Sequence, residues 1–219
     1  MKLVIANKNY SSWSLRPWFL LKESHIEFTE IREPLNYKNL KEQLGKYSPT
    51  CKVPVLMDGD LTVWDSLAIC EYISEKYLNG RGWPQEQRAR AQARAICAEM
   101  HSGFQALRNE MPMNCRASRK VDISVAAERD VKRIDNIWSQ YPREHAAEGS
   151  WLFGKFSIAD CMFAPMALRF KTYGTVLSES ATQYMKSVLV NKNIQEWVKA
   201  ALAETEIVPE NEAGIEVNR

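Results

Sequence analysis

The first 80 residues alternate short strand-like and helix-like stretches, and this order restricts the fold more than any other feature of the sequence. "KLVIA" near the N-terminus and "IEFTEIRE" at 26–33 predict two strands, with a helix over 15–22 between them. "VPVLMDGDLTVWDS" contains two apolar runs joined by Asp58-Gly59-Asp60, which predicts a hairpin. "SLAICEYISEKYL" predicts a helix that buries Leu67, Cys70, Ile73 and Tyr77. Together these elements predict a small mixed sheet packed against helices.

Strand signals fade after "LNGRGWP" at 78–84, which we interpret as a linker with Pro84 at the start of a helix. An Ala- and Arg-rich run over 85–111 predicts helix, with Gly103 as its weak point. Apolar residues at three- or four-residue steps over 123–141 predict another helix, and Ser157 and Asp160 stand at capping-box spacing. We therefore expect two domains, an α/β domain over 1–80 and an all-helical domain over 85–219. The polar tail after Pro209 is expected to be loose.

Composition excludes several classes of partner. The chain has 29 Lys and Arg against 27 Asp and Glu, a net charge of +2, so no overall field attracts nucleic acid or an acidic membrane. No apolar run reaches the roughly 18 residues of a membrane span, and we expect a cytoplasmic protein.

Cysteine and histidine spacing gives no metal site. The five cysteines form no CxxC pair and are interpreted as reduced thiols, and the three histidines show neither HxxxH nor HxH spacing. The missing CxxC also argues against a thioredoxin-like redox protein that works without glutathione.

The stretch "NKNYSSWSLRPW" gathers three serines between the first strand and the first helix. A helix that began at Ser12 would place Pro17 in its interior, so Ser14 is the expected N-cap, with Ser11 and Ser12 in the loop before it. A hydroxyl beside the free N–H groups of a first turn suits a thiolate, a phosphate or a carboxylate. A plain serine turn with a helix cap is the alternative.

Four segments, in this order, resemble the motifs of the soluble glutathione transferases, in the broad group that includes the zeta and omega classes: "SSWSLRPWFLL", "SPTCKVPVLMDG", "VWDSLAICEYI" and "FSIADCMFAP". The resemblance covers nearly the whole chain and implies a thioredoxin-like N-terminal domain with a mixed four-stranded sheet, followed by an all-α domain. It also implies glutathione as co-substrate and a homodimer.

The resemblance assigns roles to particular residues. Ser11, followed by Arg16, would donate to the glutathione sulfur, with Tyr10 and Ser12 as alternative donors. Glutathione would also be bound by Lys52, Val53, Pro54, Asp65 and Ser66. In this arrangement Val53 pairs with the peptide backbone, Pro54 follows a cis bond, and Asp65 and Ser66 hold the γ-glutamyl end. The alternatives are a trans proline at a strand edge, a simple N-cap at Asp65-Ser66 and a solvated Lys52.

The expected activity is attack of the glutathione thiolate on a small hydrophobic electrophile, as in detoxification. Its pocket would be lined by Met100, Phe104, Met111 and Met113, and the alternative for each is core packing. Arg108 either meets an anionic substrate or is solvated, and Cys51 either forms a mixed disulfide with glutathione or is a bystander. A glutathione-dependent isomerase or peroxidase, or a noncatalytic interaction protein, are the alternative functions.

Overall fold

A four-stranded mixed sheet forms the N-terminal part of the computed structural model, which describes residues 1–35 and 39–217. The strands are β1 (Lys2–Ile5), β2 (Thr29–Arg32), β3 (Val55–Asp58) and β4 (Leu61–Val63), in the order β2-β1-β3-β4. β1 is parallel to β2 and antiparallel to β3, and β3 and β4 form an antiparallel hairpin. The predicted mixed sheet and hairpin are both confirmed.

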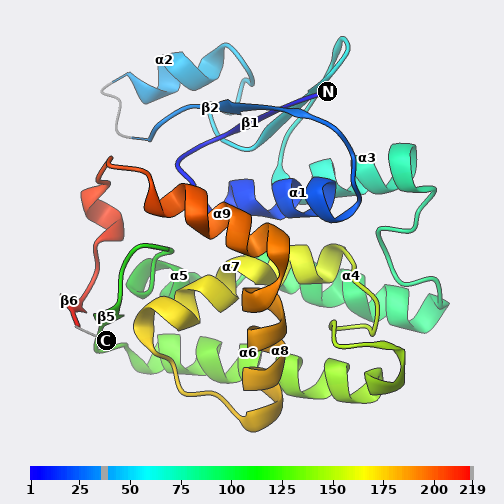
Figure 1. The fold of residues 1–219 in the computed structure, drawn as a ribbon, viewed down its shortest axis with the longest axis vertical. Helices are drawn as coiled ribbons and strands as arrows, with labels where there is room; N and C mark the ends of the chain where they lie inside the picture. The colour runs from blue at the N-terminus through cyan, green and yellow to red at the C-terminus, as the bar shows by residue number, and fades with distance from the viewer. Residues whose placement is uncertain (36–38, 218–219) are drawn as a thin grey trace.

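Three helices accompany this sheet: α1 (Ser12–Glu23), α2 (Leu40–Gly45) and α3 (Ser66–Leu78). α1 and α3 lie between the sheet and the helical part of the chain, whereas α2 lies at the opposite side of the sheet (Figure 1). α3 buries Cys70 and Ile73 as predicted, but Tyr77 is 36% exposed. The last turn of α3 extends beyond the core, and there the Tyr77 hydroxyl donates to Asp58 at the hairpin turn.

The C-terminal part is mainly helical. Its helices are α4 (Gln87–Ser102), α5 (Gln105–Glu110), α6 (Val125–Glu144), α7 (Ile158–Tyr173), α8 (Glu179–Val190) and α9 (Lys192–Leu202). α7 is buried along nearly its whole length and begins with the predicted capping box of Ser157 and Asp160. Burial raises the pKa of Asp160 to about 6, although its carboxylate accepts hydrogen bonds from the Leu152 N–H and the Tyr184 hydroxyl.

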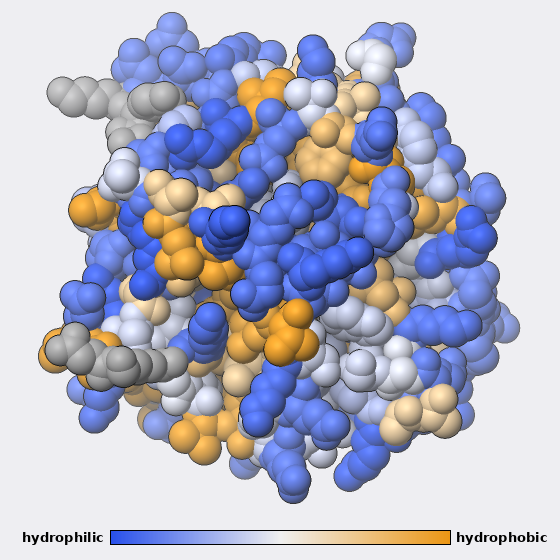
Figure 2. Space-filling model, viewed as in Figure 1, coloured by the Kyte–Doolittle hydropathy of each residue, from blue (hydrophilic) through white to orange (hydrophobic). Residues whose placement is uncertain are grey.

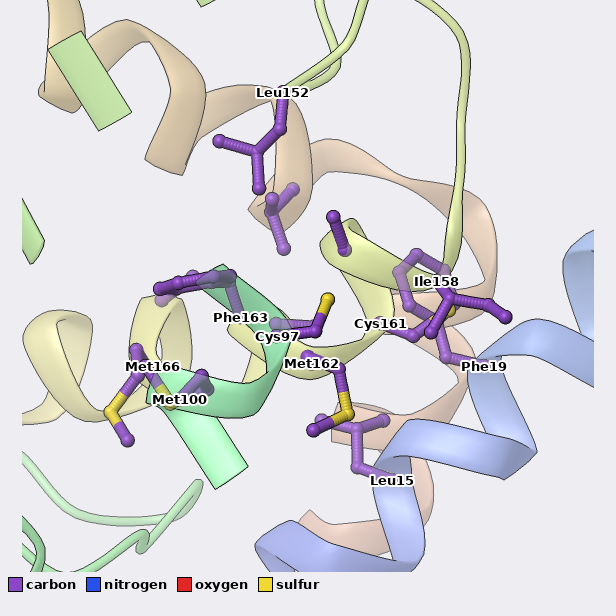
Figure 3. Packing of buried hydrophobic residues seen from close by; sticks show 14 of the residues in the cluster. Leu15, Phe19, Cys97, Met100, Leu152, Ile158, Cys161, Met162, Phe163 and Met166 are labelled. Carbon is purple, nitrogen blue, oxygen red and sulfur yellow. The ribbon is translucent and has the colours of Figure 1, made fainter. Parts of the chain in front are cut away.

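Packing of α1 against α7 joins the two parts. Leu15 and Phe19 of α1 lie against Met162 and Cys161 of α7, in one cluster of buried side chains (Figure 3). All four of these side chains are fully buried, so the sheet and the helices share a continuous core. The active-site candidates on the β1–α1 loop are therefore anchored to a rigid support.

The start of α1 differs from the prediction. The helix begins at Ser12 with Ser11 at the N-cap, and Pro17 lies inside it. The first helical bond runs from the Leu15 N–H to the Ser11 carbonyl, so Pro17 deprives only the Trp13 carbonyl of its usual donor. This cost is outweighed by the packing of Leu15 and the other buried residues of α1.

The predicted linker is also packed more tightly than expected. Trp83 is 3% exposed, and Pro84 precedes the helix instead of starting it. α4 begins only at Gln87 because Glu86 is its N-cap and accepts from the Arg88 and Ala89 N–H groups. Gly103, the predicted weak point, does separate α4 from α5.

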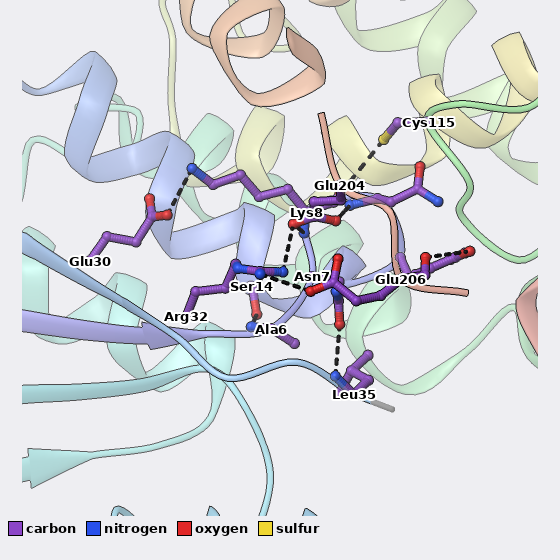
Figure 4. Close-up of polar contacts among 12 residues, drawn as sticks. Ala6, Asn7, Lys8, Ser14, Glu30, Arg32, Leu35, Cys115, Glu204 and Glu206 are labelled. Carbon is purple, nitrogen blue, oxygen red and sulfur yellow. Dashed lines mark hydrogen bonds and ion pairs between the residues drawn. The ribbon is translucent and has the colours of Figure 1, made fainter. Parts of the chain in front are cut away.

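The expectation of a loose tail is wrong, whereas the helical character of the second part is confirmed, with one short two-stranded sheet added to it. Strand β6 (Ile215–Glu216) pairs with β5 (Arg119–Lys120), and the chain that leads to it contacts the β1–α1 loop. Glu204 accepts hydrogen bonds from the N–H groups of Lys8 and Asn9 at 2.7 and 3.0 Å (Figure 4). These partners lie about 200 residues away, so local sequence patterns gave no sign of them. Residues 218–219 of the tail lie outside the described residues.

The face shown in Figure 2 is mainly hydrophilic, with apolar side chains in small separate patches. In the part of the chain that the structure describes, no helix has the length and apolar character needed to cross a membrane. Residues 1–35 and 39–217 contain no group of three or more His, Cys, Asp or Glu that could hold a metal ion.

Candidate functional site

A cavity of about 750 Å³ lies where the sheet domain meets α4, α5 and α7. The residues proposed from the sequence to bind glutathione are all in its wall: Ser11, Lys52, Val53, Pro54, Asp65 and Ser66. They come from the β1–α1 loop, the loop before β3 and the start of α3. The structure therefore brings together residues that are separated by up to 55 positions in the sequence.

The Ser11 hydroxyl takes part in a short chain of hydrogen bonds. Its Oγ lies 2.7 Å from Ser14 Oγ, and Ser14 Oγ accepts from the Ala6 N–H at 3.2 Å. When Ser14 donates to Ser11, the proton of the Ser11 hydroxyl is left to donate to another group. Ser14, the residue predicted to cap the helix, instead connects Ser11 to the end of β1.

The two alternative hydroxyls in this loop have other partners. The Tyr10 hydroxyl donates to Glu212 Oε1 at 2.6 Å, and burial followed by this hydrogen bond raises the pKa of Tyr10. Ser12 Oγ accepts from Arg169 Nη2 at 3.3 Å. Both side chains line the cavity, but each is held toward the C-terminal part of the chain.

In the loop before β3, the Val53–Pro54 peptide bond is cis, as is the Trp64–Asp65 bond before α3. Val53 and Pro54 directly precede β3, and Pro54 is buried while Val53 is half-buried. Lys52 is exposed beside them. Cys51 is partly exposed, has a positive φ of 52° and also belongs to the cavity wall.

Asp65 and Ser66 form the N-terminus of α3. Asp65 Oδ1 accepts from the Leu67 and Ala68 N–H groups at 2.9 and 3.2 Å, so Asp65 is an N-cap. Its Oδ2 lies 2.9 Å from His101 Nε2 of α4. Burial, together with repulsion from Arg16 and Arg108, keeps the pKa of His101 below its ordinary value, although Asp65 opposes this shift.

Arg16 lies behind this N-terminus and is completely buried. Its Nη1 donates to Ser66 Oγ at 3.2 Å. Its guanidinium also stacks on the ring of Trp13 at 4.2 Å, and Arg108 lies over the same ring at 5.0 Å. Burial is the main cause that lowers the pKa of Arg16 to about 9.

Comparison with known proteins gives a family match for the N-terminal part of the chain. The family model for the glutathione S-transferase N-terminal domain matches residues 10–76, which contain every one of the six residues named above. Over these residues the chain is similar to the soluble glutathione S-transferases.

The chain is also similar to several curated proteins and solved structures. The chain is 41% identical over 63 residues to a dichloromethane dehalogenase from Methylophilus leisingeri, a match over 28% of this chain and about a quarter (24%) of that protein. A stringent starvation protein A homolog from Pasteurella multocida is 24% identical over 171 residues, or 78% of this chain and 76% of that protein. The crystal structure of a glutathione transferase homolog from Burkholderia gl BGR1, with bound glutathione, has the same fold, with a TM-score of 0.68 and 24% identity over 91% of this chain and 97% of that one.

Three of the four residues predicted to line the second substrate's pocket are not in the cavity wall of this chain. All four, Met100, Phe104, Met111 and Met113, are at most 6% exposed and belong to the core cluster, and of the four Met113 also lines the cavity. Figure 3 shows Met100 among buried side chains. A periodic apolar pattern cannot separate core from cavity wall, because both are apolar.

Trp13, His101 and Arg169 also line the cavity and were not proposed as site residues. Arg169 carried a usable signal, because it interrupts the apolar run "CMFAPMALRF" of a buried helix, where a charge is costly. His101 carried no such signal, since its partner Asp65 lies 36 positions away. Arg108, left open between two interpretations, is in the wall of the cavity.

Proposed function

We propose that this chain is a glutathione transferase, which binds glutathione in the cavity and uses its sulfur to attack a small electrophile. The observation that carries the proposal is the convergence of Ser11, Val53, Asp65 and Ser66 on one cavity within the matched glutathione S-transferase domain. A noncatalytic scaffold does not require this complete set of polar and backbone groups in one place.

Each part of glutathione has a counterpart in the cavity wall. The backbone of Val53 would pair with the cysteinyl backbone of glutathione, as a sheet edge pairs with an extended peptide. The second oxygen of Asp65 would take the ammonium group, and the N-terminus of α3 with the Ser66 hydroxyl would take the γ-glutamyl carboxylate. Lys52, which is exposed beside Val53, would pair with the other carboxylate.

Ser11 would stabilise the thiolate by donating its hydroxyl proton to the sulfur. A free thiol has a pKa of about 8.5 and is mostly protonated at neutral pH, and the thiolate is the nucleophile. A hydrogen bond to a charged group contributes about 1.5–3 kcal/mol, which corresponds to a decrease of about 1–2 units in the thiol pKa. The thiolate then forms a bond to an electrophilic carbon, the leaving group departs with its bonding electrons, and the thiol proton goes to solvent.

A noncatalytic interaction protein is the second candidate. The 171-residue match is to a protein named for stringent starvation, whose name gives no glutathione reaction. A glutathione-dependent isomerase or peroxidase would use the same thiolate.

The test compares wild type with Ser11→Ala, and with Ser187→Ala as a matched control on the exposed side of α8. Retention on immobilised glutathione reports binding, turnover of a chlorodinitrobenzene reports transfer, and ultraviolet titration of bound glutathione reports the thiol pKa. We expect Ser11→Ala to bind glutathione, to raise the thiol pKa by about 1–2 units and to lower kcat/KM about 10- to 100-fold. Binding without turnover of any electrophile would identify the noncatalytic function, and no binding would refute the proposal.

A further inference from the structure

Three arginines from different helices gather at the side of the cavity formed by the helical part. We name Arg16 of α1, Arg108 of α5 and Arg169 of α7 the arginine cluster. Arg16 and Arg169 are 0% and 5% exposed. Burial lowers the pKa of Arg169 to about 9, and repulsion from Arg108 lowers it further in the same direction. Burial likewise lowers the pKa of Arg108 to about 10. The cluster thus concentrates positive charge in a desolvated place.

Neutral groups supply the observed hydrogen-bond acceptors of Arg108 and Arg169. Arg108 donates to the Gly103 and Met100 carbonyls, and Arg169 donates to the Met111 carbonyl and to Ser12 Oγ. Within residues 1–35 and 39–217, no carboxylate lies within 4.0 Å of any member of the cluster. A buried charge is normally compensated by an opposite charge. Asp130 is near enough to oppose the lowering of the Arg108 pKa, but it accepts from the Leu107 N–H and forms no ion pair with the cluster, so Arg169 in particular lacks a paired anion.

One donor of Arg169 is without any partner in the described part of the chain. The buried Nη1 has no acceptor, although Arg169 lines the cavity and its Nε and Nη2 are both bonded. An unsatisfied buried donor is costly, and the cost is larger for a charged group. A carboxylate in the adjoining cavity would supply an acceptor for this guanidinium.

The charges of the cavity wall are mainly positive. Among the described residues its basic side chains are Lys52, Arg108 and Arg169, and its acidic side chain is Asp65, which His101 already contacts. Lys52 and Asp65 lie on the sheet domain, where the proposed function places glutathione. Arg108 and Arg169 lie on the helical part, beside Pro112 and Met113, on the side left for the second substrate.

We propose that Arg108 and Arg169 bind a carboxylate on the electrophile, so that the second substrate is an anionic electrophile and not a purely hydrophobic one. A guanidinium matches the two oxygens of a carboxylate, and the contact of Arg108 with the Trp13 ring holds its plane. This inference rests on the proposed transferase function and names its substrate class. A competing role for Arg169, stabilisation of the thiolate through the neighbouring Ser12, would act on every electrophile equally.

The test uses a chloronitrobenzoate and the corresponding chloronitrobenzamide, which differ in charge and have similar reactive carbons. The kcat/KM of each is measured with glutathione for wild type, Arg108→Gln, Arg169→Gln and Arg94→Gln. Arg94 is an exposed arginine of α4 outside the cavity wall and is the matched control. Values are corrected for the uncatalysed rates of the two compounds.

Wild type and Arg94→Gln are expected to prefer the benzoate, and Arg108→Gln to lower that preference about 10- to 100-fold, mainly through KM. Arg169→Gln should act in the same direction, and Arg108→Gln keeps the inference testable if Arg169→Gln does not fold. Turnover of the amide without preference for the benzoate would overturn the inference and leave the transferase function standing. A raised thiol pKa in Arg169→Gln, with equal losses on both compounds, would assign the cluster to the thiolate and overturn the inference. Failure to turn over either compound, in a protein that turns over the chlorodinitrobenzene, would overturn the inference alone.

Discussion

Ser14→Ala removes the side chain that connects the end of β1 to Ser11, and the structure predicts two separate consequences. Ser14 Oγ accepts the Ala6 N–H at 3.2 Å and lies 2.7 Å from Ser11 Oγ, and both Ser14 and Ala6 are fully buried. Without Ser14 Oγ, the Ala6 N–H has no acceptor, which costs about 1–3 kcal/mol of stability. For a chain of this size the melting temperature would fall by about 2–4 °C for each kcal/mol.

The second consequence concerns the glutathione thiol. A donor behind Ser11 strengthens the bond from Ser11 to the thiolate by about 10–30%, and that bond contributes about 1.5–3 kcal/mol. Loss of this support corresponds to about 0.2–0.9 kcal/mol, or an increase of about 0.1–0.7 units in the thiol pKa. This increase is smaller than the one expected for Ser11→Ala, because Ser11 itself remains.

Thermal unfolding measures the first effect and ultraviolet titration of bound glutathione measures the second, with Ser11→Ala and Ser187→Ala in parallel. An unchanged melting temperature would show that the Ala6–Ser14 hydrogen bond does not support the loop. A thiol pKa that rises more in Ser14→Ala than in Ser11→Ala would refute the proposed order of donors and place Ser14 nearer the sulfur.

Three further results are expected. The pKa of His101 is lowered in the folded protein, so the folded state favours the neutral imidazole. The stability that depends on this neutral ring is fully present above the ordinary pKa of about 6.5 and is lost as pH falls. A neutral His101 also leaves the charge of Asp65 available to glutathione. A protonated His101 would compete with the ammonium group of glutathione for Asp65. The KM for glutathione should therefore rise below the lowered pKa of His101 in wild type and not in His101→Gln, as steady-state kinetics across pH will show. Glu212→Ala should destabilise the chain by about 1–3 kcal/mol in chemical denaturation, because the Tyr10 hydroxyl and other buried donors lose their acceptor. Cys51 should be the first thiol to react with a disulfide reagent, and glutathione should protect it; equal fast labelling of Cys51→Ser would contradict this.

Much of the fold could be predicted from local patterns. The Asp58-Gly59-Asp60 turn predicted the hairpin, and the spacing of Ser157 and Asp160 predicted the start of α7, because turn and cap chemistry depends on neighbours a few residues apart. The start of α1 was misplaced because the penalty for Pro17 was given more weight than the buried face of the helix.

The candidate site was predictable only in its N-terminal half. The motifs around Ser11, Val53 and Asp65 are short, and each contains its own turn or cap, so the resemblance located them. His101 and Arg169 take their roles from partners on other elements, and no spacing rule connects residues so far apart. For the same reason Met100 could not be separated from Met113.

The sequence by itself determined the order of strands and helices, the family motifs and the residues expected to hold glutathione, since these depend on local periodicity and on short motifs. Only the tertiary structure decided which charges face the cavity and how the tail is held. Packing of α1 against α7 brings the arginines together, and pairing of β6 with β5 brings Glu212 to Tyr10. Such contacts depend on the whole chain burying its apolar surface at once, so a linear pattern does not contain them.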